Sequence, residues 1–159
     1  MKRIISLLCV MLMIFSLSAC AAKNEEPAGS AGEQTAEETD GQNPVMNFIG
    51  VYALDRASIT VEADGMENAK FFVTWSSSAA EHSEWVMTGK FDPETLTVEY
   101  TDCVKTTITF KESGEIESEV VNYENGTGSF TFAEGDALTL TWDDGMEQVA
   151  DGSVFTYAS

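Results

Sequence analysis

The chain has 159 residues, with 27 acidic against 8 basic side chains, a formal net charge of -19 and a sequence pI near 4.1. This excess of negative charge excludes a nucleic-acid partner that is held through its phosphates. With 43% hydrophobic and 10% aromatic residues the chain is too apolar to be disordered throughout, and its length favours a single folded domain.

The first 19 residues have the pattern of a secretory signal peptide. Lys2 and Arg3 form a positive start, and an apolar run from Ile4 to Leu17 follows, interrupted only by two serines. The run is too short, and too sharply followed by polar chain, to be a stable membrane span. We therefore expect residues 1–19 to direct export and to be removed.

The apolar run ends in Leu17-Ser18-Ala19-Cys20, which resembles the bacterial lipobox. The resemblance implies that Cys20 receives the lipid, becomes the first residue of the mature protein and anchors it to the cell membrane on the extracytoplasmic face. Acyl chains contribute about 0.8 kcal/mol for each buried methylene, which is enough for anchoring without a transmembrane helix. The alternative is an ordinary signal peptide with an incidental cysteine.

Residues 20–45 are predicted to form the lipidated cysteine and a disordered acidic tether. From position 21 this stretch has no aromatic residue, six acids and one base. It cannot bury enough apolar surface to offset the loss of chain entropy on folding. We expect the tether to hold the folded domain away from the membrane.

Residues 46–159 are predicted to form the folded domain, which is all-β. Hydrophobic residues alternate at period two in short segments, and pairs such as Asp64-Gly65 and Asn125-Gly126 mark the turns between them. The alternating segments are 48–54, 59–63, 71–75, 85–87, 96–100, 104–110, 130–132, 138–142 and 155–157. This spacing favours an antiparallel up-and-down meander.

We expect the meander to close as a small barrel of eight to ten strands. Its first and last segments are both aromatic and alternating, so that pairing them would remove both sheet edges. One short helical turn is predicted near residues 78–82, because Ser78-Ala79-Ala80-Glu81 has the spacing of a capping box. Such a turn could cover one end of the barrel.

The opening Phe48-x-Gly50-x-Tyr52, followed by a meander of this size, resembles the lipocalin-like, or calycin, small barrels. A second likeness is to the lipid-anchored lysozyme inhibitors, through a glycine-rich segment at 125–130 and Trp142-Asp143-Asp144-Gly145. The lysine and the paired cysteines typical of those inhibitors are missing, so no inhibitory residue is transferred. The two resemblances imply a binding barrel, with either a small ligand or a cationic protein such as lysozyme as its partner.

Catalytic chemistry has little support in the sequence. His82 is the single histidine, and the serines and acids that could join it lie within nine residues of it, whereas catalytic triads are normally assembled from separate elements. A hydrolase centred on His82 remains the enzymatic alternative. We predict no catalytic residue.

No metal site and no cofactor are predicted either. The segment Asp143-Asp144-Gly145-Met146-Glu147 lacks the spacing of a calcium loop, and its acids suit a tight turn. Once Cys9 has left with the signal peptide and Cys20 carries lipid, Cys103 is alone, so the domain has no disulfide. Cys103 is then either a small buried hydrophobic residue or an exposed reactive thiol.

Four aromatic residues are the candidates for a ligand-binding mouth of the barrel: Trp75, Trp85, Trp142 and Tyr100. Flat rings with polar groups often bind sugars or apolar ligands, and the alternative is that these rings are core. The acidic exterior would instead attract a cationic protein. The sequence thus predicts a non-enzymatic surface lipoprotein that binds one of these partners.

Overall fold

The structure is a computed structural model that describes residues 42–148 and 150–159. The predicted signal peptide, the lipidated Cys20 and the tether up to residue 41 lie outside the described residues. The elements are a 3-10 helix, η1 (Pro44–Asn47), and the strands β1 (Gly50–Leu54), β2 (Ala57–Asp64), β3 (Asn68–Ser78), β4 (Glu81–Asp92), β5 (Thr97–Phe110), β6 (Ile116–Ala133), β7 (Thr139–Asp144) and β8 (Ser153–Tyr157).

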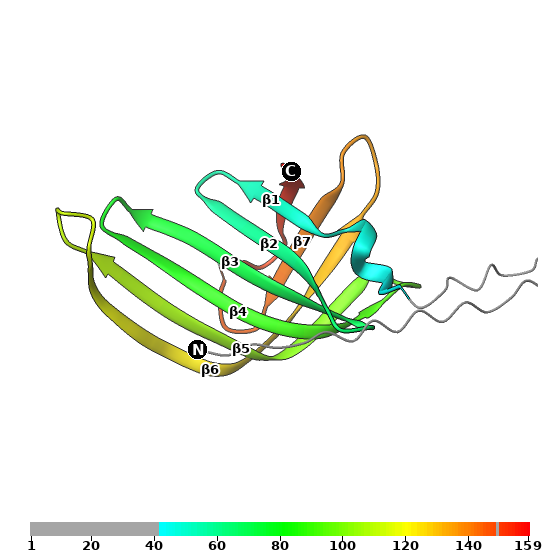
Figure 1. The fold of residues 1–159 in the computed structure, drawn as a ribbon, viewed down its shortest axis with the longest axis horizontal. Coiled ribbons are helices and arrows are strands. Elements are labelled where there is room, and N and C mark those ends of the chain that lie inside the picture. The colour runs from blue at the N-terminus through cyan, green and yellow to red at the C-terminus, as the bar shows by residue number, and fades with distance from the viewer. Residues whose placement is uncertain (1–41, 149) are drawn as a thin grey trace, which may run out of the picture. The chain divides into compact units, whose positions relative to one another are not determined.

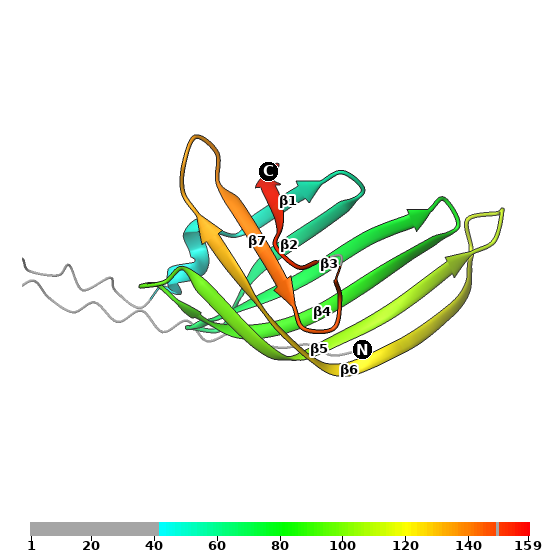
Figure 2. The same cartoon turned by 180° about the vertical axis from the view of Figure 1, so that it is seen from behind.

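The eight strands form a closed antiparallel barrel, which confirms the predicted all-β meander. Each strand pairs with the next, and β1 closes the ring on β8 through Tyr52↔Tyr157 and Ala53↔Thr156. The chain end strengthens this closure, because Val51 N donates to Ser159 O (2.7 Å). The first and last strands therefore pair as predicted, and Figures 1 and 2 show them side by side.

The predicted helical turn near residues 78–82 is wrong. The two strands β3 and β4 continue into this region and are joined by a two-residue turn at Ala79 and Ala80. Ser78 Oγ does accept a hydrogen bond from Ala80 N (3.1 Å), but it does so within the hairpin, where Ser78 lies opposite Glu81. An isolated helical turn is unfavourable because it fixes several residues for few hydrogen bonds, whereas the hairpin extends two existing strands.

The packed domain begins before Met46, the predicted boundary. Asn43 is buried, and its side chain accepts a hydrogen bond from Val45 N (3.0 Å) and donates one to Asn68 O (2.7 Å). Val45 is fully buried. The last residues assigned to the tether therefore cover one end of the barrel through η1.

Aromatic side chains fill the barrel interior. Phe71 and Phe130 stack with their ring centroids 4.0 Å apart, and Trp142 lies against the other side of the stack, 5.9 Å from Phe130. Tyr52, Tyr100 and Phe155 are fully buried with them. Except in β5, the alternation read from the sequence identified which side of each strand faces this core.

The exception in β5 is a bulge at Thr101 and Asp102. Both residues are exposed, and the pairing shifts between Tyr100 and Val104 along β4 and between Tyr100 and Cys103 along β6. Asp102 stabilises the bulge by accepting a hydrogen bond from Thr88 N (3.0 Å). The bulge reverses the alternation, so that Cys103 is buried where the simple pattern predicted Val104.

Candidate functional site

A small cavity lies at the open end of the barrel interior. Its volume is about 190 Å³, and three strands and one loop contribute to it. The side chains around it are Trp75 and Ser77 from β3, Ser83 and Trp85 from β4, Lys105 from β5, and Glu147 from the β7–β8 loop. The cavity therefore has aromatic walls and a charged pair at one side.

The charged pair of the cavity is Lys105 and Glu147. Lys105 Nζ lies 2.5 Å from Glu147 Oε1, and the two side chains are only 18% and 17% exposed. The same ammonium lies 4.9 Å from the centroid of the Trp85 ring. A cation that is held by both a carboxylate and an aromatic face is strongly fixed in place, so the pair forms a rigid polar wall.

Trp85 is fixed by its neighbours as well. Its Nε1 donates to the Tyr123 hydroxyl (3.0 Å), and its ring meets Trp142 edge-on at 5.4 Å. Burial raises the pKa of Tyr123, so its hydroxyl stays protonated. The ring at the cavity wall is thus held by both a hydrogen bond and packing.

A buried network beneath the cavity fastens the loop that carries Glu147. The Trp142 Nε1–H donates to the Tyr100 hydroxyl (2.8 Å), which donates to Asp144 Oδ2 (2.5 Å). Asp144 Oδ1 accepts the backbone N–H groups of Met146 (2.7 Å) and Glu147 (3.0 Å). Burial and the hydrogen bond to Asp144 raise the pKa of Tyr100, so the hydroxyl remains a donor. The loop geometry therefore depends on the core.

The four predicted site residues fall into two groups. Trp75 and Trp85 contribute to the cavity, whereas Trp142 and Tyr100 are buried below it and hold the loop. The sequence pattern missed Lys105 and Glu147, which are 42 residues apart. The one usable signal for Lys105 is its place in the alternating pattern of a strand. This pattern puts Lys105 on the inner side only when the bulge in β5 is taken into account.

The other chemically notable residues of the sequence do not form a reactive site in the described part of the chain. Burial, with Asp144 as a smaller cause, raises the pKa of Cys103 to about 12, so this thiol is inert. His82 Nε2 lies 3.1 Å from Glu84 Oε1, and the ring packs 5.0 Å from Phe110. No serine hydroxyl in the described ranges bonds to that ring, so the geometry gives no support to a triad.

In the acidic segment considered for calcium, the carboxylates of Asp143 and Asp144 accept hydrogen bonds from the backbone of the turn itself. Asp144 accepts the two loop amides given above, and Asp143 Oδ1 accepts Gly152 N (2.8 Å). Across the described part of the chain, no group of three or more histidine, cysteine, aspartate or glutamate side chains is arranged to hold a metal ion.

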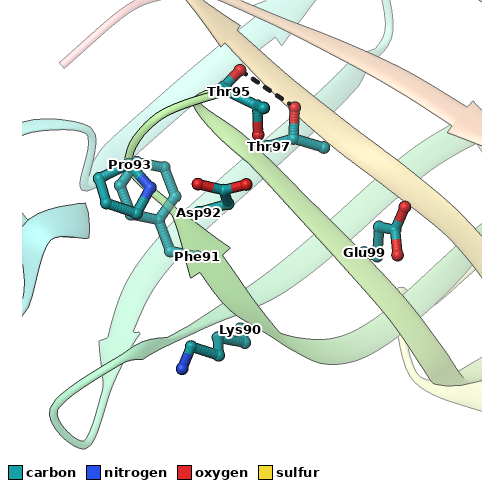
Figure 3. A pocket seen from close by; sticks show the side chains of 7 residues that line it. All are labelled: Lys90, Phe91, Asp92, Pro93, Thr95, Thr97 and Glu99. Atoms are coloured by element: carbon teal, nitrogen blue, oxygen red, sulfur yellow. Dashed lines mark hydrogen bonds between the residues drawn. The ribbon is translucent and has the colours of Figure 1, made fainter.

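Two larger surface grooves carry little chemistry. One, of about 550 Å³, surrounds the β4–β5 turn, where Figure 3 shows Lys90 and Glu99 lying apart from Asp92 and Thr97. Asp92 serves the turn itself by accepting Glu94 N (2.9 Å), which lowers the pKa of its carboxyl group. The other groove, of about 630 Å³, lies between the β3–β4 and β5–β6 turns.

Comparison of the chain with models of protein families, with curated proteins and with solved structures gives no match. A search for membrane-spanning helices in the described residues finds none that is long and apolar enough to cross a bilayer.

Proposed function

We propose that this chain is a non-enzymatic binding protein, anchored by a lipid on Cys20 at the extracytoplasmic face of a membrane, and that its barrel binds a partner through its outer surface. The observation that carries this proposal is the filled interior. Stacked Phe71 and Phe130, with buried Trp142, occupy the space in which a hollow barrel would enclose a ligand. A partner must therefore be met outside the core.

The surface charge favours a cationic protein as the partner. Residues 46–159 carry 5 basic and 21 acidic side chains, a net charge of -16. All five basic side chains already have a partner: Arg56 pairs with Asp55, Lys90 with Glu67, Lys105 with Glu147 and Lys111 with Glu115, and Lys70 lies over Phe72. Most carboxylates are left to face solvent, where they attract a protein of opposite charge, such as lysozyme.

The mouth cavity supports a second candidate, a small-ligand site. Its volume of about 190 Å³ lies below the roughly 300–1,000 Å³ of pockets for drug-sized ligands, so it would accept a single ring at most. Trp75, which lines the cavity and is only partly buried, supplies an aromatic ring of the kind on which sugars stack. A saturable change in tryptophan fluorescence with N-acetylglucosamine, abolished by Trp75→Ala, would favour this candidate.

The anchor is tested by labelling growing cells with a radioactive fatty acid. Wild-type protein should take up the label and sediment with membranes. Cys20→Ser should lose the label, and Cys9→Ser, a cysteine 11 positions earlier in the predicted signal peptide, should retain it. Equal labelling of wild type and Cys20→Ser would refute the anchor.

The partner is tested by calorimetry with lysozyme as the probe. Binding should weaken about tenfold between about 20 mM and about 150 mM salt, because salt screens exposed charges. Succinylated lysozyme, whose charge is reversed, is the control and should not bind. Absence of binding to lysozyme at low salt would refute the cationic partner.

The non-enzymatic assignment has its own test. A screen with ester, peptide and glycoside substrates should detect no turnover. An activity that His82→Ala removes would establish the hydrolase alternative instead.

A further inference from the structure

About two-thirds of strand β6 lacks a pairing strand on one side. β6 pairs with β5 from Ile116 to Thr131, but it pairs with β7 only from Gly128 to Ala133. Among the described strands, no other one pairs with residues 116–127 of β6. In Figures 1 and 2 this stretch of β6 borders the part of the sheet, formed with β5, that projects beyond the barrel. Because Thr127 O accepts a hydrogen bond from Gly145 N (2.9 Å), we call residues 116–126 the open edge.

The adjacent hairpins show which main-chain groups face the open edge. Phe110 N donates to Ala80 O (2.9 Å), so the main-chain groups of Phe110 point toward β4. β5 pairs with β4 without a break from Lys105 to Thr109. Because main-chain groups point alternately to the two sides of a strand, those of Thr107 point toward β6.

Thr107 lies opposite Val120, which therefore exchanges its hydrogen bonds with β5. Glu119 and Val121, on either side of Val120, point their N–H and C=O groups away from β5. These groups form a row of free donors and acceptors, which is the template for adding another strand.

The side chains of the open edge combine apolar and acidic groups. Ile116, Val120 and Val121 are 52%, 52% and 56% exposed. Glu117 and Glu119 lie among them and are exposed as well. Neither glutamate has an ion-pair partner in the described part of the chain. The edge thus offers apolar contact together with unpaired negative charge.

The charge decides what can occupy this edge. A second copy of the chain would bring Glu117 and Glu119 next to the same residues of its neighbour, and like charges on paired strands repel. The tether of the chain itself is also acidic, with six acids and one base over residues 21–45. An extended segment with basic side chains would place opposite charges across the new ladder.

We propose that the open edge binds an extended segment of a cationic protein by strand addition, with lysine or arginine at alternate positions and β-branched apolar residues between them. This inference rests on the proposed binding function and names the part of the barrel that performs it. Main-chain hydrogen bonds to Glu119 and Val121 supply the register, and the alternate side chains supply selectivity. The exposed valines then become partly buried against the partner.

The test uses a fluorescent peptide of about nine residues in which lysine alternates with valine and threonine, a length that matches a long strand. Its binding to the protein is followed by fluorescence anisotropy. A second peptide has the same sequence with N-methyl groups on alternate backbone amides, which removes hydrogen bonding and keeps the charge. The first peptide should bind saturably, and the second should bind at least about tenfold more weakly.

Three variants locate the binding. Val121→Pro removes one N–H that faces the open edge and should weaken binding about tenfold, with an unchanged circular dichroism spectrum. Glu119→Lys should weaken it about fivefold or more, whereas Glu94→Lys, which makes the same change of charge in the β4–β5 turn, should alter it less than about twofold.

Three outcomes would overturn the inference: equal binding of the N-methylated peptide, equal effects of Glu119→Lys and Glu94→Lys, or no saturable binding of the first peptide. If lysozyme still binds in a salt-dependent way when the peptide does not, the proposed function stands and only the open edge is excluded. If neither binds, both proposals fall.

Discussion

The hydroxyl of Tyr100 joins the core to the loop at the barrel mouth, and Tyr100→Phe removes only this group. In the wild type the hydroxyl accepts the Trp142 indole N–H (2.8 Å) and donates to Asp144 (2.5 Å). Trp142 is fully buried and Asp144 is 8% exposed, so water can replace little of what is lost. We expect Tyr100→Phe to lower the free energy of unfolding substantially.

The magnitude follows from the two bonds. A buried donor left without a partner costs about 1–3 kcal/mol, and a hydrogen bond to a charged group contributes about 1.5–3 kcal/mol. Because Asp144 keeps its hydrogen bonds to two loop amides, losing its bond to the hydroxyl should cost an amount at the low end of the second range. The expected total is about 3 kcal/mol, or a fall in Tm of roughly 12 °C for a domain of this size.

Tyr52→Phe is the matched control. The Tyr52 hydroxyl is also buried but makes one neutral bond, to Phe48 O (2.8 Å), so its loss should cost about 1 kcal/mol. Urea unfolding, followed by tryptophan fluorescence and by circular dichroism, gives both values. A loss for Tyr100→Phe no larger than that for Tyr52→Phe would refute the role assigned to the network.

Two further predictions concern the same region. Burial raises the pKa of Cys103 from its usual value near 9 to about 12. Between these two pH values the thiol loses its proton in the unfolded state only, so the free energy of unfolding falls by about 1.4 kcal/mol for each pH unit. Urea unfolding from pH 8 upward should therefore show wild type losing stability faster above about pH 9 than Cys103→Ala, and parallel pH curves would contradict the burial argument. Gly128→Ala would place a Cβ 2.3 Å from both Asp143 O and the Tyr100 hydroxyl, and it should cost about 1–3 kcal/mol. In the same urea titration Gly135→Ala, whose Cβ would have its nearest neighbour at 3.7 Å, should change stability by less than about 0.5 kcal/mol, and equal effects of the two alanines would show that the close approach is relieved at little cost.

Much of the architecture could be predicted because it depends on local patterns. Alternation at period two places Phe71, Val73 and Trp75 of β3 on the inner side of the strand, and Trp142 on the inner side of β7. The structure buries all of these side chains except Trp75, which lines the cavity. The ring closure followed from matching aromatic ends, since an unpaired edge in a small barrel leaves main-chain groups unsatisfied.

The failures lie where the pattern depends on a partner strand. The bulge at Thr101 and Asp102 reverses the alternation in β5, and it becomes apparent only from the pairing with β4 and β6. The capping spacing of Ser78 and Glu81 predicts a helical turn near residues 78–82, although in the hairpin these two residues lie opposite each other. A short motif of this kind is compatible with more than one backbone conformation.

The amino-acid sequence was sufficient for the β class, the inner face of most strands and the acid excess, because each depends on composition or on neighbours along the chain. It also indicated the closed ring, through the alternating aromatic pattern that the first and last segments share. The tertiary structure decided that Trp142 and Tyr100 lie below the mouth while Trp75 and Trp85 reach it, and that Lys105 meets Glu147. It also decided that about two-thirds of β6 has no second pairing strand, since β7 is only six residues long and β6 has 18. These features depend on bulges, strand lengths and register, which are set only when distant segments pair.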